Sequence, residues 1–266
     1  MSRTVEFREH VAGLELRRYR PLEPARARVL WIHGAGEHGG RHAAEAARLA
    51  RRGAEVWLPD LPGHGESAAS FAWTPADLRA ALAHLLAHAG AGPPFDLVGH
   101  SMGGLLAIGL VRELRLALRR CVLCAPFLAP ARPIPRWKEC AGRLAARLAP
   151  RMRFSLGLRG EDLLREPAEQ QLWFEDPLRQ RGIGARSAAA LLDEAARRAA
   201  EVERFPVPCL VLIAGEDRVA DPAVALRWAE RCSASAVVLA GLRHEILREP
   251  ERAIARLAID RFLQLV

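Results

Sequence analysis

Long hydrophobic runs are absent from this sequence of 266 residues. No apolar stretch approaches the roughly 20 residues that a membrane-spanning helix needs. Residues 1–7 contain no apolar core of a signal peptide, so we expect a protein of the cytoplasm. Aromatic residues are also scarce, at 6% with Tyr19 as the only tyrosine. Because half of the residues are hydrophobic, the chain can bury a large core, which must be mainly aliphatic.

Lysine is nearly absent, because Lys138 is the only one in the chain. The formal net charge of +8 therefore comes almost entirely from arginines, which are spread along the sequence together with abundant alanine. Such dispersion is typical of a solvated basic surface rather than of a nucleic-acid site. We expect no nucleic-acid partner.

The cysteines form no disulfide or metal-binding pattern. Their number is odd, at five, and Cys121 and Cys124 lie in an apolar strand-like run where residues three apart face opposite sides. We expect buried, reduced thiols rather than a redox pair or a zinc site. His84 and His88 share a helix face but have no evident third ligand. The sequence predicts no metal ion and no organic cofactor.

The order of apolar runs and amphipathic segments predicts an α/β fold with a doubly wound, mostly parallel sheet. Most predicted strands are continuous apolar runs, as expected for strands buried on both faces. After an opening hairpin at residues 4–10 and 14–20, we predict strands at residues 27–33, 54–59, 95–98, 120–125, 209–214 and 236–240. Helices are predicted at residues 41–52, 75–89, 104–118, 222–232 and 251–265, with Thr74 and Asp221 as N-caps.

Residues 127–206 differ from the rest of the chain. They contain several prolines and helical stretches rich in arginine, leucine and alanine, without a good strand. We interpret this segment as a helical cap inserted after the sixth strand, and residues 1–126 and 207–266 as the core domain. In such sheets ligands bind at the carboxyl ends of the strands, so we expect the cap to cover the site.

Apolar and basic residues alternate along the first part of the predicted cap. Apolar Trp137, Leu144, Leu148 and Phe154 are interspersed with Arg136, Arg143, Arg147, Arg151 and Arg153. As helices, these stretches would have one apolar and one basic face. We expect the apolar face to line an acyl-binding pocket. The basic face is either solvated or in peripheral contact with anionic lipid surfaces.

The pentapeptide Gly99-His100-Ser101-Met102-Gly103 has the G-x-S-x-G pattern of a nucleophile elbow. It lies between a predicted strand and a predicted helix, which is the context that this tight turn requires. The glycines remove side chains that would collide in the turn, and the serine is exposed at the end of the strand. We expect His100 to be buried and structural. The pattern alone is a weak signal, so the partners of Ser101 decide its function.

A nucleophilic serine needs a base and an orienting carboxylate. His244 is the only histidine downstream of Ser101, and it follows the last predicted strand. Three carboxylates follow the strand before it: Glu216, Asp217 and Asp221. We favour Asp217, because Asp221 precedes a proline as a helix N-cap would and Glu216 is expected to point outward.

An oxyanion hole needs two backbone N–H donors. One is expected from Met102, directly after the nucleophile, and the other from Ala35 in the glycine-rich loop of residues 33–41. Gly34 and Gly36 allow the backbone to approach the substrate closely. The loop lacks the lysine and hydroxyl of a nucleotide-binding P-loop, so a phosphate cradle is disfavoured.

Several further histidines are assigned structural roles. His64, with Asp60 and Ser67, lies in a tight turn and is predicted to brace loops behind the site. We place His38 and His42 on a solvated surface.

Three motifs resemble those of the monoacylglycerol lipase and lysophospholipase-like branch of the α/β-hydrolases. They are H-G-A-G-E-H-G-G-R at residues 33–41, P-D-L-P-G-H-G-E-S at residues 59–67 and G-H-S-M-G-G at residues 99–104. D-P-L at residues 176–178, G-E-D-R at residues 215–218 and H-E at residues 244–245 follow in the family's order. The resemblance extends over nearly the whole chain and implies an α/β-hydrolase fold.

The resemblance also implies roles for individual residues. Ser101, Asp217 and His244 match the catalytic triad, and Ala35 and Met102 match the oxyanion hole. Glu37 and Arg41 match positions that shape the polar pocket for the alcohol part of the substrate. Leu247 stands where the animal monoacylglycerol lipases have a second, glycerol-binding histidine. This departure weakens the assignment of glycerol as the leaving group.

We therefore expect a serine carboxylic-ester hydrolase that acts on small, lipid-like esters of the monoacylglycerol or lysophospholipid type through an acyl-enzyme. An acyltransferase or thioesterase with the same triad is the alternative among enzymes. Serine in the elbow, rather than aspartate, argues against dehalogenase or epoxide hydrolase chemistry. A catalytically silent binding module on this fold is the alternative from another class.

Overall fold

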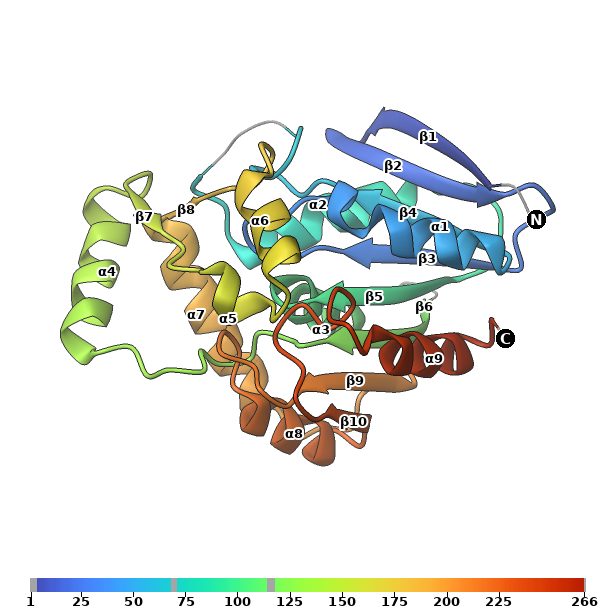
Figure 1. Ribbon diagram of the computed structural model, residues 1–266. Coiled ribbons are helices and arrows are strands. Elements are labelled where there is room, and N and C mark those ends of the chain that lie inside the picture. Colours follow the sequence, from blue (N-terminus) through green and yellow to red (C-terminus); the bar gives the residue numbers. More distant parts are fainter. Residues whose placement is uncertain (1–3, 68–70, 114–117, 266) are drawn as a thin grey trace.

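The computed structural model describes residues 4–67, 71–113 and 118–265. Its centre is an eight-stranded sheet (Figure 1). The strands lie in the order β1 (Thr4–Val11), β2 (Leu14–Pro21), β4 (Ala54–Pro59), β3 (Ala27–Ile32), β5 (Phe95–His100), β6 (Leu118–Cys124), β9 (Cys209–Ala214) and β10 (Ser235–Leu239). β2 pairs antiparallel with β1 and β4, and the other neighbouring strands are parallel. The prediction of a doubly wound, mostly parallel sheet is confirmed.

Helices cover both faces of this sheet and enclose two hydrophobic cores. On one face lie α1 (Ala43–Arg51), which follows the 3-10 turn η1 (Gly39–His42), and α9 (Arg252–Leu263). On the other lie α2 (Pro75–Ala87), α3 (Met102–Glu113) and α8 (Pro222–Arg231). Cys121 belongs to the α3 side and Cys124 to the α1 side, so they face opposite cores, as predicted. Every residue of β3 and β5 is buried.

Two helix starts follow directly from side-chain chemistry. Thr74 and Asp77 form a reciprocal capping box at the start of α2, and Asp221 accepts hydrogen bonds from two amides of the first turn of α8. A proline follows each cap, where its missing N–H costs nothing. Both predicted N-caps are confirmed.

The segment between β6 and β9 contains more strand than the sequence predicted. It comprises α4 (Arg136–Leu148), β7 (Arg153–Ser155), α5 (Gly160–Leu163), α6 (Pro167–Glu175), β8 (Gly182–Gly184) and α7 (Ala185–Ala199). β7 and β8 pair antiparallel as a separate two-stranded sheet. The expectation of a segment without strands was wrong, because three residues are too few to show an alternating pattern.

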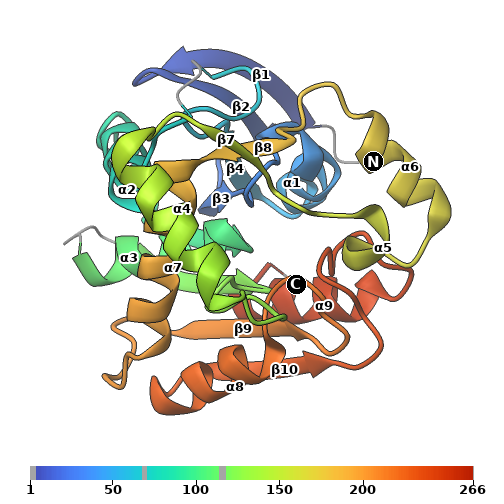
Figure 2. The ribbon, with the colours of Figure 1, turned by 90° about the vertical axis from the view of Figure 1, so that its left-hand side faces the viewer.

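This inserted segment lies beside the sheet at the end where the parallel strands finish (Figure 1). α4 stands at the outer edge of the molecule and packs against α7, which is also seen when the view is turned (Figure 2). No residue of α4 is buried. α7 also contacts α2, α3 and α8, so this helix packs the inserted segment against the helices of the core.

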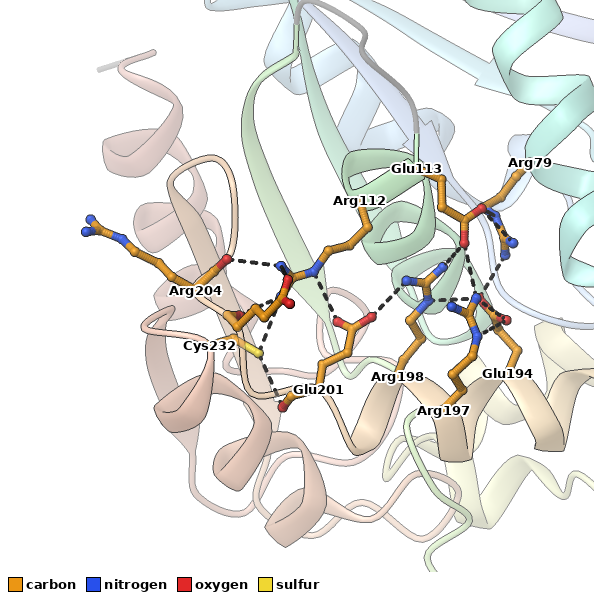
Figure 3. A network of polar contacts seen from close by, with 10 residues as sticks. Arg79, Arg112, Glu113, Glu194, Arg197, Arg198, Glu201, Arg204 and Cys232 are labelled. Atoms are coloured by element: carbon orange, nitrogen blue, oxygen red, sulfur yellow. Dashed lines mark hydrogen bonds and ion pairs between the residues drawn. The ribbon is translucent and has the colours of Figure 1, made fainter.

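A network of charged side chains joins α7 to α2 and α3 (Figure 3). Arg198 of α7 is 2% exposed, and its Nε and Nη1 atoms lie 2.9 and 2.8 Å from carboxylate oxygens of Glu194 and Glu201. Arg198 also contacts Glu113 of α3. Arg79 of α2 bonds both Glu194 and Glu113 at 2.9 Å. Since each buried charge depends on its partners, this network fixes the position of α7.

Candidate active site

Ser101 occupies the sharp turn between β5 and α3. Its φ of 52° lies in the left-handed region, which non-glycine residues rarely adopt. Gly99 and Gly103 leave no room for a side chain. A Cβ on Gly103 would lie 2.1 Å from the carbonyl oxygen of Ile32. A Cβ on Gly99 would lie 2.4 Å from the carbonyl oxygen of Gly103. The turn therefore has the strained geometry that the G-x-S-x-G pattern predicts.

Asp217 and His244 form a buried pair at the ends of β9 and β10. The Nδ1 atom of His244 lies 2.7 Å from Oδ2 of Asp217, and both side chains are 3% exposed. The other carboxylate oxygen, Oδ1, accepts hydrogen bonds from the amides of Val219 and Ala220 at 2.8 and 2.9 Å. These amides fix the carboxylate, which in turn places the proton of the imidazole on Nδ1 and leaves Nε2 as an acceptor.

The other two carboxylates after β9 have different places. Glu216 is exposed, as expected, and Asp221 caps α8. Only Asp217 of the three is paired with His244 in the described part of the chain.

Ser101 and His244 line one cavity of about 320 Å³ at the carboxyl end of the sheet. No hydrogen bond joins Ser101 Oγ to His244 within the described residues. Such bonds are often long before a substrate tightens the site. The rest of the lining is mainly apolar and comes from the inserted segment as well as the core, including Phe127, Leu156, Trp173 and Leu191.

The two predicted oxyanion donors face the same cavity. Ala35 and Met102 both line it, and neither amide donates a hydrogen bond to another described residue. Gly34 lies against Ser101, because a Cβ there would be 3.1 Å from Cβ of Ser101. Met102 opens α3, so the positive end of the helix dipole points to this place.

Glu37 belongs to the glycine-rich loop of residues 33–41, called the oxyanion loop below, and contacts two histidines. Its Oε2 atom accepts from the Gly34 amide at 2.8 Å and lies 3.2 Å from both His42 Nε2 and His100 Nδ1. Burial raises the pKa of Glu37, but the charge and hydrogen bond of His100, together with those of His42, outweigh it and lower this pKa well below its usual value. Burial lowers the pKa of His42 despite the nearby Glu37 carboxylate.

Arg41 lies away from the Ser101 cavity. Its side chain is 3% exposed, and its Nη2 atom lies 3.0 Å from both carboxylate oxygens of Glu245, while Nη1 lies 3.4 Å from Asp176. It lines a different cavity of about 170 Å³ behind the site. The structure therefore brings Glu37, but not Arg41, to the cavity of Ser101. The sequence did not predict that Glu245 pairs with Arg41. Its position next to His244 was the only feature of the sequence that pointed to it.

The expectation that His38 and His42 lie on a solvated surface was wrong. His38 is 7% exposed and its Nε2 atom lies 2.9 Å from Asp176, whereas His42 packs against Trp31 and bonds Glu37. The glycine-rich loop folds back into the core, so its polar side chains become internal braces.

The turn at residues 59–67 braces the oxyanion loop, as predicted. The Asp60 carboxylate accepts from the Gly39 amide at 2.7 Å and from the Glu66 amide at 2.8 Å. His33 accepts from the Leu61 amide at 3.0 Å. Burial, with a smaller effect of His64, lowers the pKa of His33 to about 3, so this ring stays neutral.

Only one group of side chains in the described chain has the composition and spacing of a metal site. Ligand atoms of Glu37, His42 and His100 lie within 4.8 Å of one another. His42 and His100 both contact the same carboxylate oxygen, Oε2 of Glu37. The five cysteines are free, and four of them are buried.

Within the described residues, no helix combines the length and the apolar character needed to cross a membrane.

Comparison with known proteins places this geometry in a family. Residues 23–251 match the Hydrolase_4 family model, described as serine aminopeptidase, S33. "Phospholipase YtpA" of Bacillus subtilis is 29% identical over 239 residues, covering 84% of this chain and 90% of the relative. "Monoglyceride lipase" of Mus musculus is 30% identical over 214 residues, covering 77% of this chain and 70% of the relative.

The fold is also close to that of a solved structure, the monoacylglycerol lipase of Paleococcus ferrophilus. The TM-score is 0.87 at 26% identity, covering 95% of this chain and 99% of that chain. The chain belongs to the Hydrolase_4 family of α/β-hydrolases and is a serine hydrolase of the lipase and esterase type.

Proposed function

We propose that Ser101, His244 and Asp217 are the nucleophile, the base and the orienting acid of a carboxylic-ester hydrolase. The observation that carries this proposal is the buried Asp217–His244 pair, 2.7 Å apart, beside a strained elbow serine. His244 takes the proton of Ser101 Oγ as this oxygen attacks the ester carbonyl. The oxyanion of the tetrahedral intermediate accepts from the amides of Ala35 and Met102.

The remaining steps need the same residues. As the intermediate collapses, the bond from the carbonyl carbon to the alcohol oxygen breaks, and His244 gives its proton to the leaving alcohol. His244 then takes a proton from water as the water oxygen attacks the acyl carbonyl carbon. When this second intermediate collapses, the bond from that carbon to Ser101 Oγ breaks, and His244 returns the proton to Oγ as the carboxylic acid leaves. This sequence needs no metal ion or organic cofactor.

We infer that Glu37 and Arg41 act on the alcohol side in different ways. Glu37 lines the cavity of Ser101, so its unshared carboxylate oxygen is a candidate acceptor for an alcohol hydroxyl. Arg41 holds Glu245 and Asp176 instead, and we propose that it supports the pocket from behind.

We propose that residues 127–206 form the cap and that the substrate is a lipid-like ester. The Ser101 cavity shares Ile134 and Leu192 with an apolar cavity of about 570 Å³ between α4 and α7. We propose that an acyl chain extends from the Ser101 cavity into this adjoining apolar cavity. The phospholipase and monoglyceride lipase relatives are named for lipid esters, which supports the same substrate class.

α4 supports a proposal of peripheral membrane contact. Trp137, Leu144 and Leu148 are 69, 57 and 77% exposed, and arginines lie beside them on the same helix. We expect Leu148→Ser with Trp137→Ala to weaken sedimentation with vesicles rich in phosphatidylglycerol and to leave hydrolysis of a water-soluble p-nitrophenyl ester intact. Equal sedimentation of the wild type and this variant would refute the contact. The cytoplasm remains our proposed location, in keeping with the free thiols.

The test of the mechanism uses a fluorophosphonate probe and a p-nitrophenyl ester. We expect the wild type to be labelled, Ser101→Ala to lose labelling, and Ser101→Ala and His244→Ala each to lose turnover by several orders of magnitude. Ser235→Ala is the matched control, because Ser235 is exposed at the start of β10. Wild-type turnover in Ser101→Ala would overturn the mechanism. Absence of labelling in the wild type would favour a silent binding module.

A second set of measurements separates the chemical alternatives. Monoacylglycerols, lysophospholipids and acyl thioesters of graded chain length are compared as substrates, with and without an added alcohol as acyl acceptor. Preference for the thioesters would favour a thioesterase, and transfer to the alcohol in place of water would favour an acyltransferase.

A further inference from the structure

A further cavity lies beside the oxyanion loop, at Ala35 and Gly36. Its volume is about 190 Å³, and it shares Ala35, Leu156 and Trp173 with the cavity of Ser101. Its own lining adds Arg179 and Arg181, which precede β8. The two cavities therefore adjoin each other at Ala35.

The two arginines in this cavity form no ion pair with a carboxylate of the described chain. Neither Arg179 nor Arg181 takes part in an ion pair or a side-chain hydrogen bond within the described residues. Many other arginines are paired, including Arg41, Arg79 and Arg198. Two uncompensated guanidinium groups give this cavity a positive potential, which attracts anions.

Arg179 stacks on Trp173 in a way that leaves the N–H groups of its guanidinium group without hydrogen-bond partners in the described chain. Its guanidinium carbon lies 3.9 Å from the centre of the Trp173 ring, and its partly buried side chain leaves Nε without a partner. Stacking fixes the plane of the group and uses none of its N–H donors. Burial, then Arg181 and Arg41, lower the pKa of Arg179 and outweigh the opposite effect of the Asp176 carboxylate.

The backbone holds this segment rigidly against the oxyanion loop. The Gln180 amide donates to the carbonyl oxygen of Gly36 at 2.9 Å. Gly36 has a φ of +81°, and a Cβ there would lie 2.9 Å from the carbonyl oxygen of Gln180. The Leu156 amide donates to the carbonyl oxygen of Arg181 at 3.3 Å. The arginines are thus fixed relative to Ala35, the proposed oxyanion donor.

We propose that Arg179 and Arg181 form a subsite for an anionic phosphate on the alcohol part of the substrate. This proposal rests on the proposed ester hydrolysis and names its substrate class as acyl esters of a phosphorylated alcohol, such as lysophosphatidylglycerol. The planar guanidinium group of Arg179 matches two phosphate oxygens, and Arg181 adds a second cation at the open side of the cavity.

The kinetic test compares 1-oleoyl-lysophosphatidylglycerol with 1-oleoylglycerol. We expect Arg179→Gln and Arg181→Gln each to lower the ratio of kcat/KM for the first substrate over the second, by about 10- to 100-fold for Arg179 and less for exposed Arg181. Arg186→Gln is the matched control, because Arg186 is an exposed arginine outside both cavities. An unchanged ratio in both variants, or an equal fall in the Arg186 variant, would overturn the subsite.

Binding to the Ser101→Ala protein tests the subsite without turnover. We expect calorimetry to show that glycerol 3-phosphate binds to this protein and that glycerol does not. In the double variant Ser101→Ala with Arg179→Gln, the affinity for glycerol 3-phosphate should fall about 10-fold or more. Equal affinity for inorganic phosphate would overturn the headgroup assignment in favour of a free-phosphate site. No binding of glycerol 3-phosphate would overturn the subsite. Failure of the catalytic proposal is distinguished from failure of the subsite, because in the first case the fluorophosphonate probe would not label the wild type.

Discussion

The Nε2 atom of His100 lies 3.2 Å from the backbone carbonyl oxygen of His244, while Nδ1 of the same ring lies 3.2 Å from Glu37. A carbonyl and a carboxylate only accept hydrogen bonds, so the ring satisfies both only when both nitrogens carry protons. Glu37 also accepts from the Gly34 amide. The His100 imidazolium therefore connects the oxyanion loop to the loop that carries His244.

This connection predicts a loss of stability at alkaline pH. Burial lowers the pKa of His100, but the Glu37 charge and hydrogen bond outweigh it and raise the pKa to about 9. A folded-state pKa above the unfolded value gives stability that is fully present below pH ~6.5 and is lost as the pH rises through about 9. We expect the wild-type melting temperature to fall by roughly 5–10 °C between pH 7 and pH 10.

The variant His100→Gln isolates this contribution, because an amide has no proton to lose in this range. It should melt lower than the wild type at pH 7 and should lack most of the fall between pH 7 and pH 10. His84→Gln serves as the control, since His84 is exposed on α2. The same pH dependence in the wild type and in His100→Gln would show that His100 is not the titrating group.

Asp217→Asn is expected to lower kcat by about 10³- to 10⁴-fold while the protein stays folded. The amides of Val219 and Ala220 hold Oδ1 as an acceptor, so the new NH₂ group must take the place of Oδ2. It then donates to Nδ1 of His244, which moves the ring proton to Nε2, where catalysis needs a lone pair. The pre-steady-state rate of acylation by a p-nitrophenyl ester measures this loss.

Asp221→Asn is the matched control for that prediction. Asp221 lies in the same loop and caps α8, and asparagine is as good an N-cap as aspartate. We expect turnover to stay within about twofold of the wild type, since this carboxylate has no contact with His244 in the described structure. Equal loss in both variants would mean that the loop, and not the carboxylate on His244, determines activity.

Whether a feature of this protein could be predicted from its sequence depends on how far apart in the sequence the interacting residues lie. The strands and the two helix caps follow from neighbouring residues, because burial and capping act over a few positions. Ser101, His244 and Asp217 could be predicted as candidate site residues because each follows a strand in the order that the α/β-hydrolase fold requires. The Arg41–Glu245 contact joins residues 204 positions apart, and no local pattern contains it.

The same limit explains the errors. His38 and His42 lie in a polar, glycine-rich stretch that reads as exposed, and only the return of the loop into the core buries them. β7 and β8 have three residues each, so pairing with each other, rather than their own sequence, makes them strands.

Gly103→Ala is expected to destabilise the fold by about 1–3 kcal/mol, because the new methyl group would collide with the backbone of β3. Gly142→Ala is the opposite case: its site on exposed α4 is open, and alanine favours a helix by about 0.5–1 kcal/mol. Urea denaturation of both variants checks the signs. A neutral or stabilising Gly103→Ala would contradict the close packing of the elbow on β3.

Arg198→Met is expected to destabilise the protein by about 1–3 kcal/mol, since Glu194 and Glu201 each lose one buried counter-charge and keep only Arg79 with Arg197, and Arg112, respectively. Arg197→Met, whose side chain is 53% exposed in the same helix, should cost about 1 kcal/mol or less. If unpaired charge is the cause, Glu194→Gln in the Arg198→Met background should restore part of the loss. A double-mutant cycle by urea denaturation measures this coupling. Additive effects would mean that Arg198 stabilises α7 by packing its aliphatic stem, and that the charges of the network contribute little.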